Sequence, residues 1–416
     1  MIDLRRLRED ADYRAGAVRK GATEDAIGSL LDADETARTA RSATEELRAT
    51  QNAASKEIGR AKPEERQAKI DAVAGLKSEL AALEARLAEA DEAVKTLALA
   101  VPNPAHESVP AGGEDDFRVE ATFGTETPPR AESHGEIGER LGLVDTERAV
   151  RMSGSRFAYV MGDAVLLQFG LVQYVLNKLV RKSFIPVIPP VLVREEMMID
   201  AGFFPTDRNQ VYELEKDELY LVGTAEVGLA GLHRGERLEE GELPKRYVGY
   251  SSCFRREAGT YGKDTQGLFR VHQFDKVEMF IYSDPSTSWD ELEYLRSTEQ
   301  EIFTELDIPH RVITVAAGDL GAAAAKKYDI EAWLPSEQRY REVTSCSNYT
   351  DYSARRMGTR MKTDRGTEFA HTLNGTACAI GRTMLMIFEN HQQDDGTIAV
   401  PEVLRPFCGL EVIEPK

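Results

Sequence analysis

The chain has 416 residues, of which 42% are apolar and 30% charged, so it can bury a large core and global disorder is excluded. It contains no apolar run of about 18 residues, and its start, MIDLRRLRED, lacks the apolar stretch of a secretory signal. The four cysteines are widely spaced, which argues against a disulfide framework and a structural zinc site. We therefore expect a soluble, cytoplasmic protein of two or three domains that binds no membrane. The net charge of −19 does not indicate nucleic-acid binding, although binding depends on where the basic side chains cluster.

Residues from about 26 to 99 are rich in Ala, Glu, Leu, Lys and Arg, and small or apolar residues recur at alternating steps of three and four. This period is typical of the seam of a coiled coil. The first seam comprises Leu30, Ala33, Ala37, Ala40, Thr44, Leu47, Gln51, Ala54 and Ile58, and the second comprises Val73, Leu76, Leu80, Leu83, Leu87, Ala90, Val94 and Leu97. Gly59 and Pro63 interrupt the pattern. The sequence therefore predicts an antiparallel helical hairpin, roughly 50 Å long, within an N-terminal domain of residues 1–105.

The remainder of the chain has a different character. Residues 106–135 are loaded with Pro and Gly, as expected of a linker, and a third segment of residues 136–416 follows. The run FIPVIPPVLV suits an edge strand or an extended segment, because its prolines cannot donate to a sheet. Further strands are expected at 219–224, 247–254, 268–280, 311–316 and 340–346, with a helix at 377–389. Strands with helices at both ends indicate an α+β domain around an antiparallel sheet.

The densest cluster of chemically active residues lies in residues 247–279, where two strand-like runs flank a Gly-rich loop. Arg255 and Glu257 alternate on the first run and are expected to point the same way. One face of the second run carries His272, Phe274, Lys276 and Glu278. The alternative to a binding site is a solvated strand face with cross-strand ion pairs.

Three other segments carry weaker signals. Arg382 falls in the first turn of a helix, where a cation opposes the helix dipole unless an anion lies nearby; an exposed arginine is the alternative. Glu342 and Ser345 could offer hard oxygens to magnesium, and the run from Gly223 to Glu226 is suggestive only in combination. Together these residue types suit adenylation by ATP: arginines for the phosphates, a ring for adenine and oxygens for magnesium.

The same segments resemble a known family. FRREAGTYGKDTQGLFRVHQFDKVEM resembles motif 2 of the class II aminoacyl-tRNA synthetases, NGTACAIGRTMLMIFENHQQDDGTIAVPEVLRP resembles motif 3, and FIPVIPPVLV resembles motif 1 at the dimer interface. TAEVGLAGLH, EVTSCSNYTDYSARRM and PEVLRPF, with the helical hairpin, resemble the seryl-tRNA synthetases over essentially the whole chain. The resemblance implies a homodimer in which an antiparallel-sheet class II catalytic domain follows a long coiled-coil arm. It also implies activation of L-serine with ATP and Mg²⁺ to seryl-adenylate, followed by transfer to tRNA(Ser), and to tRNA(Sec) where that tRNA is present.

The family's residue roles are carried over position by position. The catalytic residues implied by the resemblance are Arg255, Glu257 and Arg382. Its ATP-binding residues are Arg255, Arg256, Glu257, Val271, Phe274, Glu342, Val343, Thr344, Ser345 and Arg382, with Glu342 and Ser345 holding magnesium. Its serine-binding residues are Thr224, Ala225, Glu226, Arg255, Glu278, Asn374 and Thr376. Its candidate tRNA contacts are Arg38, Arg41, Arg48, Lys56, Arg60, Lys62, Arg66 and Lys69 on the arm and Lys263 in the motif 2 loop.

Within this assignment, Arg255 contacts the α-phosphate and the serine carboxylate, Phe274 stacks on adenine, and Glu278 and Thr376 receive the serine hydroxyl. Two alternatives remain open at this stage. One is an adenylating relative that loads a small amino acid onto a carrier protein or a biosynthetic intermediate, which would not need a long RNA-reading arm. The other is a non-catalytic coiled-coil scaffold, which leaves Arg255 and Arg382 unexplained.

Overall fold

The computed structural model describes residues 1–129, 132–239, 241–259, 267–364 and 366–415. These residues form two compact units, Met1–Pro104 and a second unit that begins at Ala105. No helix among the described residues is both long and apolar enough to cross a lipid bilayer.

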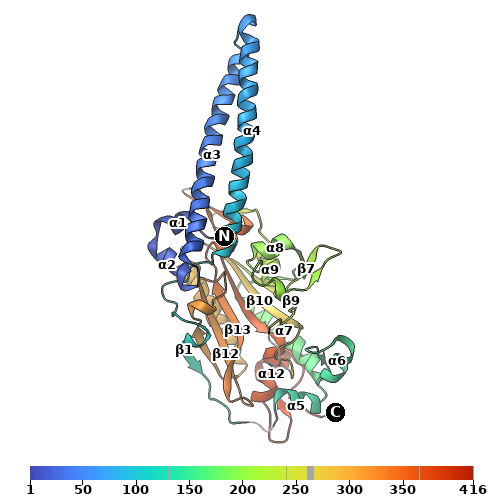
Figure 1. The fold of residues 1–416 in the computed structure, drawn as a ribbon. Helices are drawn as coiled ribbons and strands as arrows, with labels where there is room; N and C mark the ends of the chain where they lie inside the picture. Colours follow the sequence, from blue (N-terminus) through green and yellow to red (C-terminus); the bar gives the residue numbers. More distant parts are fainter. Residues whose placement is uncertain (130–131, 240, 260–266, 365, 416) are drawn as a thin grey trace. The chain divides into compact units, whose positions relative to one another are not determined.

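The first unit is helical, with α1 (Leu4–Glu9), α2 (Ala11–Arg19), α3 (Glu24–Ile58) and α4 (Pro63–Ala100). Helices α3 and α4 lie side by side as a long antiparallel hairpin (Figure 1). Thr23 caps the start of α3 by accepting from the Ala26 backbone N–H, and Pro63 occupies the first turn of α4, where its missing N–H costs nothing. The predicted hairpin and its turn are confirmed.

The hairpin is held by a narrow seam. Leu30, Ala37, Thr44 and Leu80 are buried, and the other predicted seam positions are half-buried, as the heptad spacing requires. A small core at the base packs α1 and α2 against the same helices; it contains Ile2, Leu7, Tyr13, Ala17, Ile27, Leu30, Ala98 and Val101. The arm beyond this core therefore depends on the pairing of two helices alone.

The second unit is built on an eight-stranded sheet in the order β1-β11-β12-β13-β16-β10-β9-β4. These strands are β1 (Arg118–Phe123), β11 (His310–Thr314), β12 (Lys326–Leu334), β13 (Arg339–Asn348), β16 (His371–Ala379), β10 (Gln273–Ser283), β9 (Lys245–Phe254) and β4 (Ile185–Val187). All neighbours are antiparallel except β4 and β9, which are parallel. The predicted α+β class with an antiparallel sheet is confirmed, and the proline-containing strand β4 lies at an edge.

Helices and small sheets surround this sheet (Figure 1). The helices are α5 (His134–Arg140), α6 (Thr146–Ser153), α7 (Asp163–Arg181), α8 (Glu195–Asp200), α9 (Glu226–Ala230), α10 (Ser288–Glu305), α11 (Tyr352–Met357), α12 (Ile380–Asn390) and α13 (Arg405–Cys408), with short 3₁₀ turns at Glu114–Asp116, Arg208–Gln210, Ala317–Asp319 and Glu402–Leu404. The small sheets pair β2 (Val144–Asp145) with β3 (Tyr159–Val160), β5 (Leu192–Arg194) and β6 (Glu213–Leu214) with β7 (Leu219–Leu221), β8 (Arg237–Leu238) and β15 (Gly366–Phe369) with β14 (Arg360–Thr363), and β17 (Ile398–Ala399) with β18 (Val412–Ile413).

The structure differs from the sequence prediction in the segment expected to be a linker. Within residues 106–135, strand β1 pairs with β11 at the sheet edge, and Val109 packs against Val315. The backbone N–H of His106 also donates to the Ala325 carbonyl at 2.8 Å. Proline and glycine marked the turns correctly, but the short alternating run RVEATF was enough to complete the sheet. Much of this range therefore belongs to the second unit.

The observed end of one strand and the observed start of one helix also differ from the sequence prediction, each for a physical reason. Strand β9 ends at Phe254, so Arg255 and Glu257 do not alternate on the strand as predicted. Glu257 has φ of 50°, a left-handed conformation that turns the chain out of the ladder. The predicted helix at 377–389 begins at Ile380, because the three preceding residues still belong to β16, where Cys378 and Ala379 pair with β10.

Candidate functional site

A cavity of about 270 Å³ lies against β10, β16 and β13. Side chains alternate along a strand, so Asn374 and Thr376 of β16 face the cavity while Gly375 between them faces α10. The predicted residues that line the cavity are Thr224, Glu226, Arg255, Glu257, Val271, Phe274, Glu342, Val343, Thr344, Ser345, Asn374, Thr376 and Arg382. The fold thus brings together residues that are up to 158 positions apart in the sequence.

Three of the described residues predicted to bind ATP or serine do not line it. Arg256 points away, with its guanidinium 5.8 Å from the Tyr212 ring centroid, because the chain turns sharply after β9. Ala225 is fully buried in the neighbouring apolar core, and Glu278 is fully buried beneath the cavity floor. Lys263 lies outside the described residues.

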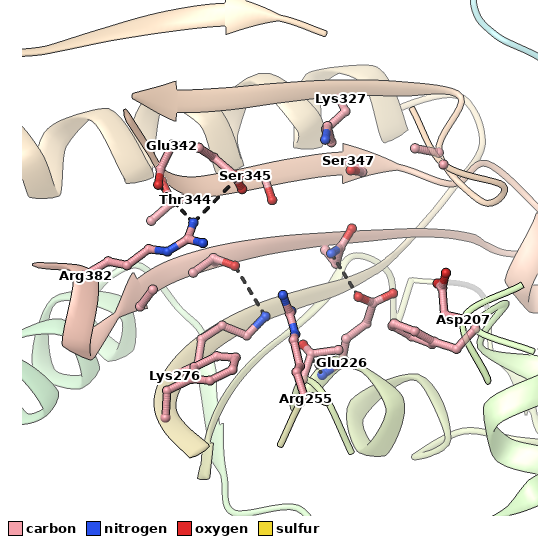
Figure 2. Close-up of a pocket in the computed structure, with 18 of the residues that line it drawn as sticks. Asp207, Glu226, Arg255, Lys276, Lys327, Glu342, Thr344, Ser345, Ser347 and Arg382 are labelled. Carbon is pink, nitrogen blue, oxygen red and sulfur yellow. Dashed lines mark hydrogen bonds and ion pairs between the residues drawn. The ribbon is translucent and has the colours of Figure 1, made fainter. Parts of the chain in front are cut away.

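Arginine side chains reach the cavity at two places. Arg255 follows β9; its Nε donates to the Gly223 carbonyl at 3.2 Å, and its guanidinium lies 5.2 Å from the Phe274 ring centroid. Figure 2 shows Arg255 extending between Lys276 and Glu226. An arginine and an aromatic ring are thereby presented to one ligand, which suits a phosphate next to a heterocyclic base.

Arg382 occupies the first turn of α12, as predicted. Its Nη1 donates to the Glu342 carbonyl at 2.9 Å and lies 3.7 Å from Glu342 Oε2, and its Nε donates to the Phe269 carbonyl at 3.3 Å. The guanidinium also lies 4.6 Å from the Phe269 ring centroid. These contacts fix the cation at one end of the cavity, where it can neutralise an anionic ligand (Figure 2).

The wall beside Arg382 offers oxygen donors. The Glu342 side chain is about half exposed, and Ser345 follows it along β13. Burial would raise the pKa of Glu342, but the charges of Arg382 and Lys327 lower it below its usual value, so the carboxylate is ionised at neutral pH. Among the described residues, no group of three or more His, Cys, Asp or Glu side chains is placed to hold a metal ion.

The other end of the cavity is a cluster of carboxylate, amide and hydroxyl groups. Asn374 Nδ2 donates to Glu226 Oε2 at 3.1 Å and to Glu278 Oε1 at 3.3 Å, and Thr376 Oγ1 donates to Glu278 Oε2 at 3.2 Å. Burial, together with the negative charge of Glu278, raises the pKa of Glu226 to about 8. A positively charged ligand group beside Glu226 would favour the ionised carboxylate, so this end of the cavity is suited to a small ligand that carries a cation.

Helix α9, which starts at Glu226, is braced against the segment after β4. A Cβ at Gly228 would stand 2.7 Å from Pro189 Cβ, so only glycine allows the helix to lie this close. The sequence showed Gly228 without indicating this contact.

Sequence reasoning gave no role to six polar residues that line the cavity, namely Asp207, Arg270, Lys276, Lys327, Ser347 and Tyr349. Lys276 shares a strand face with Phe274, and Arg270, Ser347 and Tyr349 lie within segments that resemble the family, so a signal was available for these four. Asp207 and Lys327 come from segments without such a resemblance, so only the fold places them here.

An antiparallel sheet defines a class II aminoacyl-tRNA synthetase core when it carries three features: the paired strands β9 and β10, an arginine in the first turn of the helix that follows β16, and a cavity floor of small polar residues. Residues 210–391 match the family described as tRNA synthetase class II core domain (G, H, P, S and T), and residues 1–105 match the seryl-tRNA synthetase N-terminal domain. A Mycolicibacterium smegmatis protein named serine–tRNA ligase is 49% identical over 421 residues, covering 100% of both chains.

Solved structures give the same result. Seryl-tRNA synthetase from Pyrococcus horikoshii complexed with ATP superposes with a TM-score of 0.91 at 37% identity, covering 100% of both chains. The cytoplasmic serine–tRNA ligase of Naegleria fowleri in complex with AMP has a TM-score of 0.88 at 30% identity, covering 100% of this chain and 99% of that chain. The chain belongs to the seryl-tRNA synthetase family.

We expect Arg382→Leu to weaken ATP binding about tenfold to a hundredfold, because a buried charge-assisted contact to phosphate is lost. Arg341→Leu is the matched control: Arg341 stacks on the same Phe269 ring at 3.9 Å but does not line the cavity. Isothermal titration with a non-hydrolysable ATP analogue measures both. An equal loss of affinity in the two variants would show that packing around Phe269, and not the Arg382 charge, supports the site.

Proposed function

We propose that the protein activates L-serine with ATP to form seryl-adenylate and pyrophosphate, and then transfers serine to the 3′-terminal adenosine of tRNA(Ser). The observation that carries this proposal is the polar cluster of Glu226, Asn374 and Thr376, supported from beneath by Glu278, in the cavity that Arg255 also lines. Matches that span both the arm and the core favour this activity over a carrier-loading relative or a scaffold.

In the first step, the serine carboxylate oxygen forms a bond to the α-phosphorus of ATP, and the bond from that phosphorus to the bridging oxygen breaks to release pyrophosphate. The carboxylate is already a nucleophile, so no general base is needed. Arg255 stabilises the charge that develops on the α-phosphate, Phe274 stacks on adenine, and Arg382 neutralises the far phosphates. In the second step, a hydroxyl of the terminal adenosine attacks the serine carbonyl carbon and AMP leaves.

Magnesium accompanies ATP in this proposal. The donor set fits, because the ionised Glu342 carboxylate and the Ser345 hydroxyl are hard oxygens on the wall beside Arg382. Mg²⁺ is typically held by one or two protein oxygens together with phosphates and water. Bound there, the ion would supply additional positive charge at the phosphates.

The arm is proposed to bind tRNA. Of its predicted contact residues, Arg41 and Arg48 form ion pairs across the two helices, at 2.7 Å to Asp91 and 2.6 Å to Glu84. The remaining predicted residues are Arg38, Lys56, Arg60, Lys62, Arg66 and Lys69, all exposed except the half-buried Lys69. Because exposed ion pairs contribute little energy, phosphates can replace these carboxylates, and the cations around the turn remain the most accessible.

A second copy of the chain is proposed to cover an apolar face beside β4. Leu166, Phe169 and Val180 are exposed on α7, and Ile188, just after the edge strand, is 82% exposed. A large exposed apolar patch next to an unpaired strand edge is typical of a subunit interface. Of these residues, Ile188 belongs to the segment that resembles motif 1.

We expect serine affinity to fall as the pH drops from 8 to 6. Serine brings an ammonium group to Glu226, whose carboxyl has a pKa of about 8 in the free protein. Below that pKa a proton must be released when serine binds, so affinity should fall about tenfold per pH unit. Titration of serine in buffers of different ionisation enthalpy measures affinity and proton release. Glu226→Gln should abolish the proton release, whereas release that persists in this variant would assign it to another group.

The arm is tested together with the overall reaction by removing residues 38–91 and joining the ends with a short Gly-Ser loop. This deletion keeps the small core at the base of the arm, including Leu30 and Ala98. Serine-dependent pyrophosphate exchange should stay within about twofold, while tRNA charging should fall about a hundredfold and lose most of its salt dependence. Absence of serine-dependent exchange in the intact protein would refute the proposed activity. Unchanged charging by the shortened protein would exclude the arm from tRNA binding.

Phe169→Asp should produce a monomer, because a buried unpaired charge opposes association of the apolar faces. Val119→Asp is the matched control, since Val119 is 45% exposed on β1 at the opposite edge of the same sheet. Sedimentation equilibrium distinguishes the two. A dimeric Phe169→Asp protein, or a monomeric wild type, would rule out this face as the interface.

A further inference from the structure

The cavity floor presents an ammonium group that the reaction as described does not use. Lys276 lines the cavity but is only 6% exposed. Its Nζ lies 2.5 Å from Glu278 Oε2 and 3.4 Å from Thr376 Oγ1, the contact drawn in Figure 2. Lys276 is thus in contact with both residues expected to receive the serine hydroxyl.

Glu278 itself is fully buried and does not line the cavity, whereas Lys276 and Thr376 do. A ligand group that reaches this part of the floor therefore meets the ammonium and the threonine hydroxyl before it meets the carboxylate. The ion pair also explains how a fully buried carboxylate is tolerated, since an isolated buried charge is strongly unfavourable.

The hydrogen-bonding capacity of this group matches a hydroxyl. A lysine ammonium has three donors and no acceptor, whereas a carboxylate only accepts. The contacts with Glu278 and Thr376 account for two of the three donors. A hydroxyl both donates and accepts, so it can accept from the Lys276 ammonium and donate to the Thr376 oxygen, both of which line the cavity. A methyl group in the same place satisfies neither.

We propose that Lys276 is a specificity-determining residue that donates a hydrogen bond to the side-chain oxygen of the bound serine, while its ion pair with Glu278 fixes the carboxylate that orients the Thr376 hydroxyl towards the same group. This inference rests on the function proposed above. An amino acid without the hydroxyl leaves the third ammonium donor of Lys276 unpaired in a buried site, and a site of this kind rejects the smaller analogue strongly.

The test uses two non-hydrolysable adenylate analogues, seryl- and alanyl-sulfamoyl adenosine, which differ only in the hydroxyl. Isothermal titration gives the serine-to-alanine ratio of affinities, that is, the dissociation constant of the alanyl analogue divided by that of the seryl analogue. In Lys276→Met the seryl analogue should bind about tenfold to a hundredfold more weakly, and the alanyl analogue should change less than about threefold. An equal loss of affinity for both analogues would leave the ratio unchanged. That outcome would overturn the inference, because it would show that Lys276 serves only the Glu278 carboxylate or the general fold.

Two further comparisons separate a direct contact between Lys276 and the serine hydroxyl from an indirect effect of losing a buried cation. Lys327→Met is the matched control, because Lys327 also lines the cavity beside a buried carboxylate, with Nζ 3.6 Å from Asp329 Oδ2, yet lies on β12 and away from Thr376. It should leave the serine-to-alanine ratio unchanged, and a ratio that falls as in Lys276→Met would overturn the inference.

Lys276→Met leaves Glu278 buried without its cation and can therefore fail to fold. The double variant Lys276→Met/Glu278→Gln removes both charges, and its ratio is compared with that of Glu278→Gln alone. A lower ratio in the double variant supports a direct role for Lys276, and an equal ratio overturns it. If the wild type binds neither analogue and shows no serine-dependent exchange, the proposed function fails and this inference fails with it. If the wild type prefers the seryl analogue, only the inference is at stake.

Discussion

The pairing of β10 with β16 determines the chemistry of the cavity. Their register places Glu278 opposite Thr376 and Phe280 opposite Asn374, with an irregularity between Val277 and Glu278. Because strand side chains alternate between faces, a shift of one residue would turn Thr376 and Asn374 towards α10 and away from the cavity. The buried hydrogen bonds that join these side chains exist only in the observed register. They also make any other register costly, since each would bury polar groups without partners.

The opposite face of the same strands is supported by a buried acid. Glu299 of α10 is fully buried, and its Oε2 accepts a hydrogen bond from Thr344 Oγ1 at 3.1 Å. Burial raises its pKa well above the usual range, which favours the neutral form and reduces the cost of a buried charge. A Cβ at Gly375 would stand 2.8 Å from Glu299 Oε1, which explains why glycine separates Asn374 from Thr376.

Much of this arrangement could be predicted from the sequence, because the informative features are local. The two seams of the arm and the turn at Gly59 and Pro63 follow from spacing and turn-residue rules alone. The motif resemblance then selected the residues that gather in the cavity. What the sequence could not supply is which face each side chain presents after an irregular turn.

The burial of Glu278 beneath Lys276 and the outward turn of Arg256 are consequences of tertiary packing that no local pattern encodes. The same holds for the segment before β1. Its prolines and glycines predict turns, but they do not predict that the strand between them pairs with β11, which lies almost two hundred residues further along the chain.

The close approach of Gly228 to Pro189 links the edge of the sheet to the helix that carries Glu226. Pro189 follows the edge strand beside the exposed Ile188, and Gly228 lies two residues after Glu226 in the same short helix. A side chain larger than hydrogen at position 228 would act as a wedge, displacing α9 and withdrawing the Glu226 carboxyl from Asn374. The shape of the cavity beside Glu226 therefore depends in part on how the chain packs just after the edge strand.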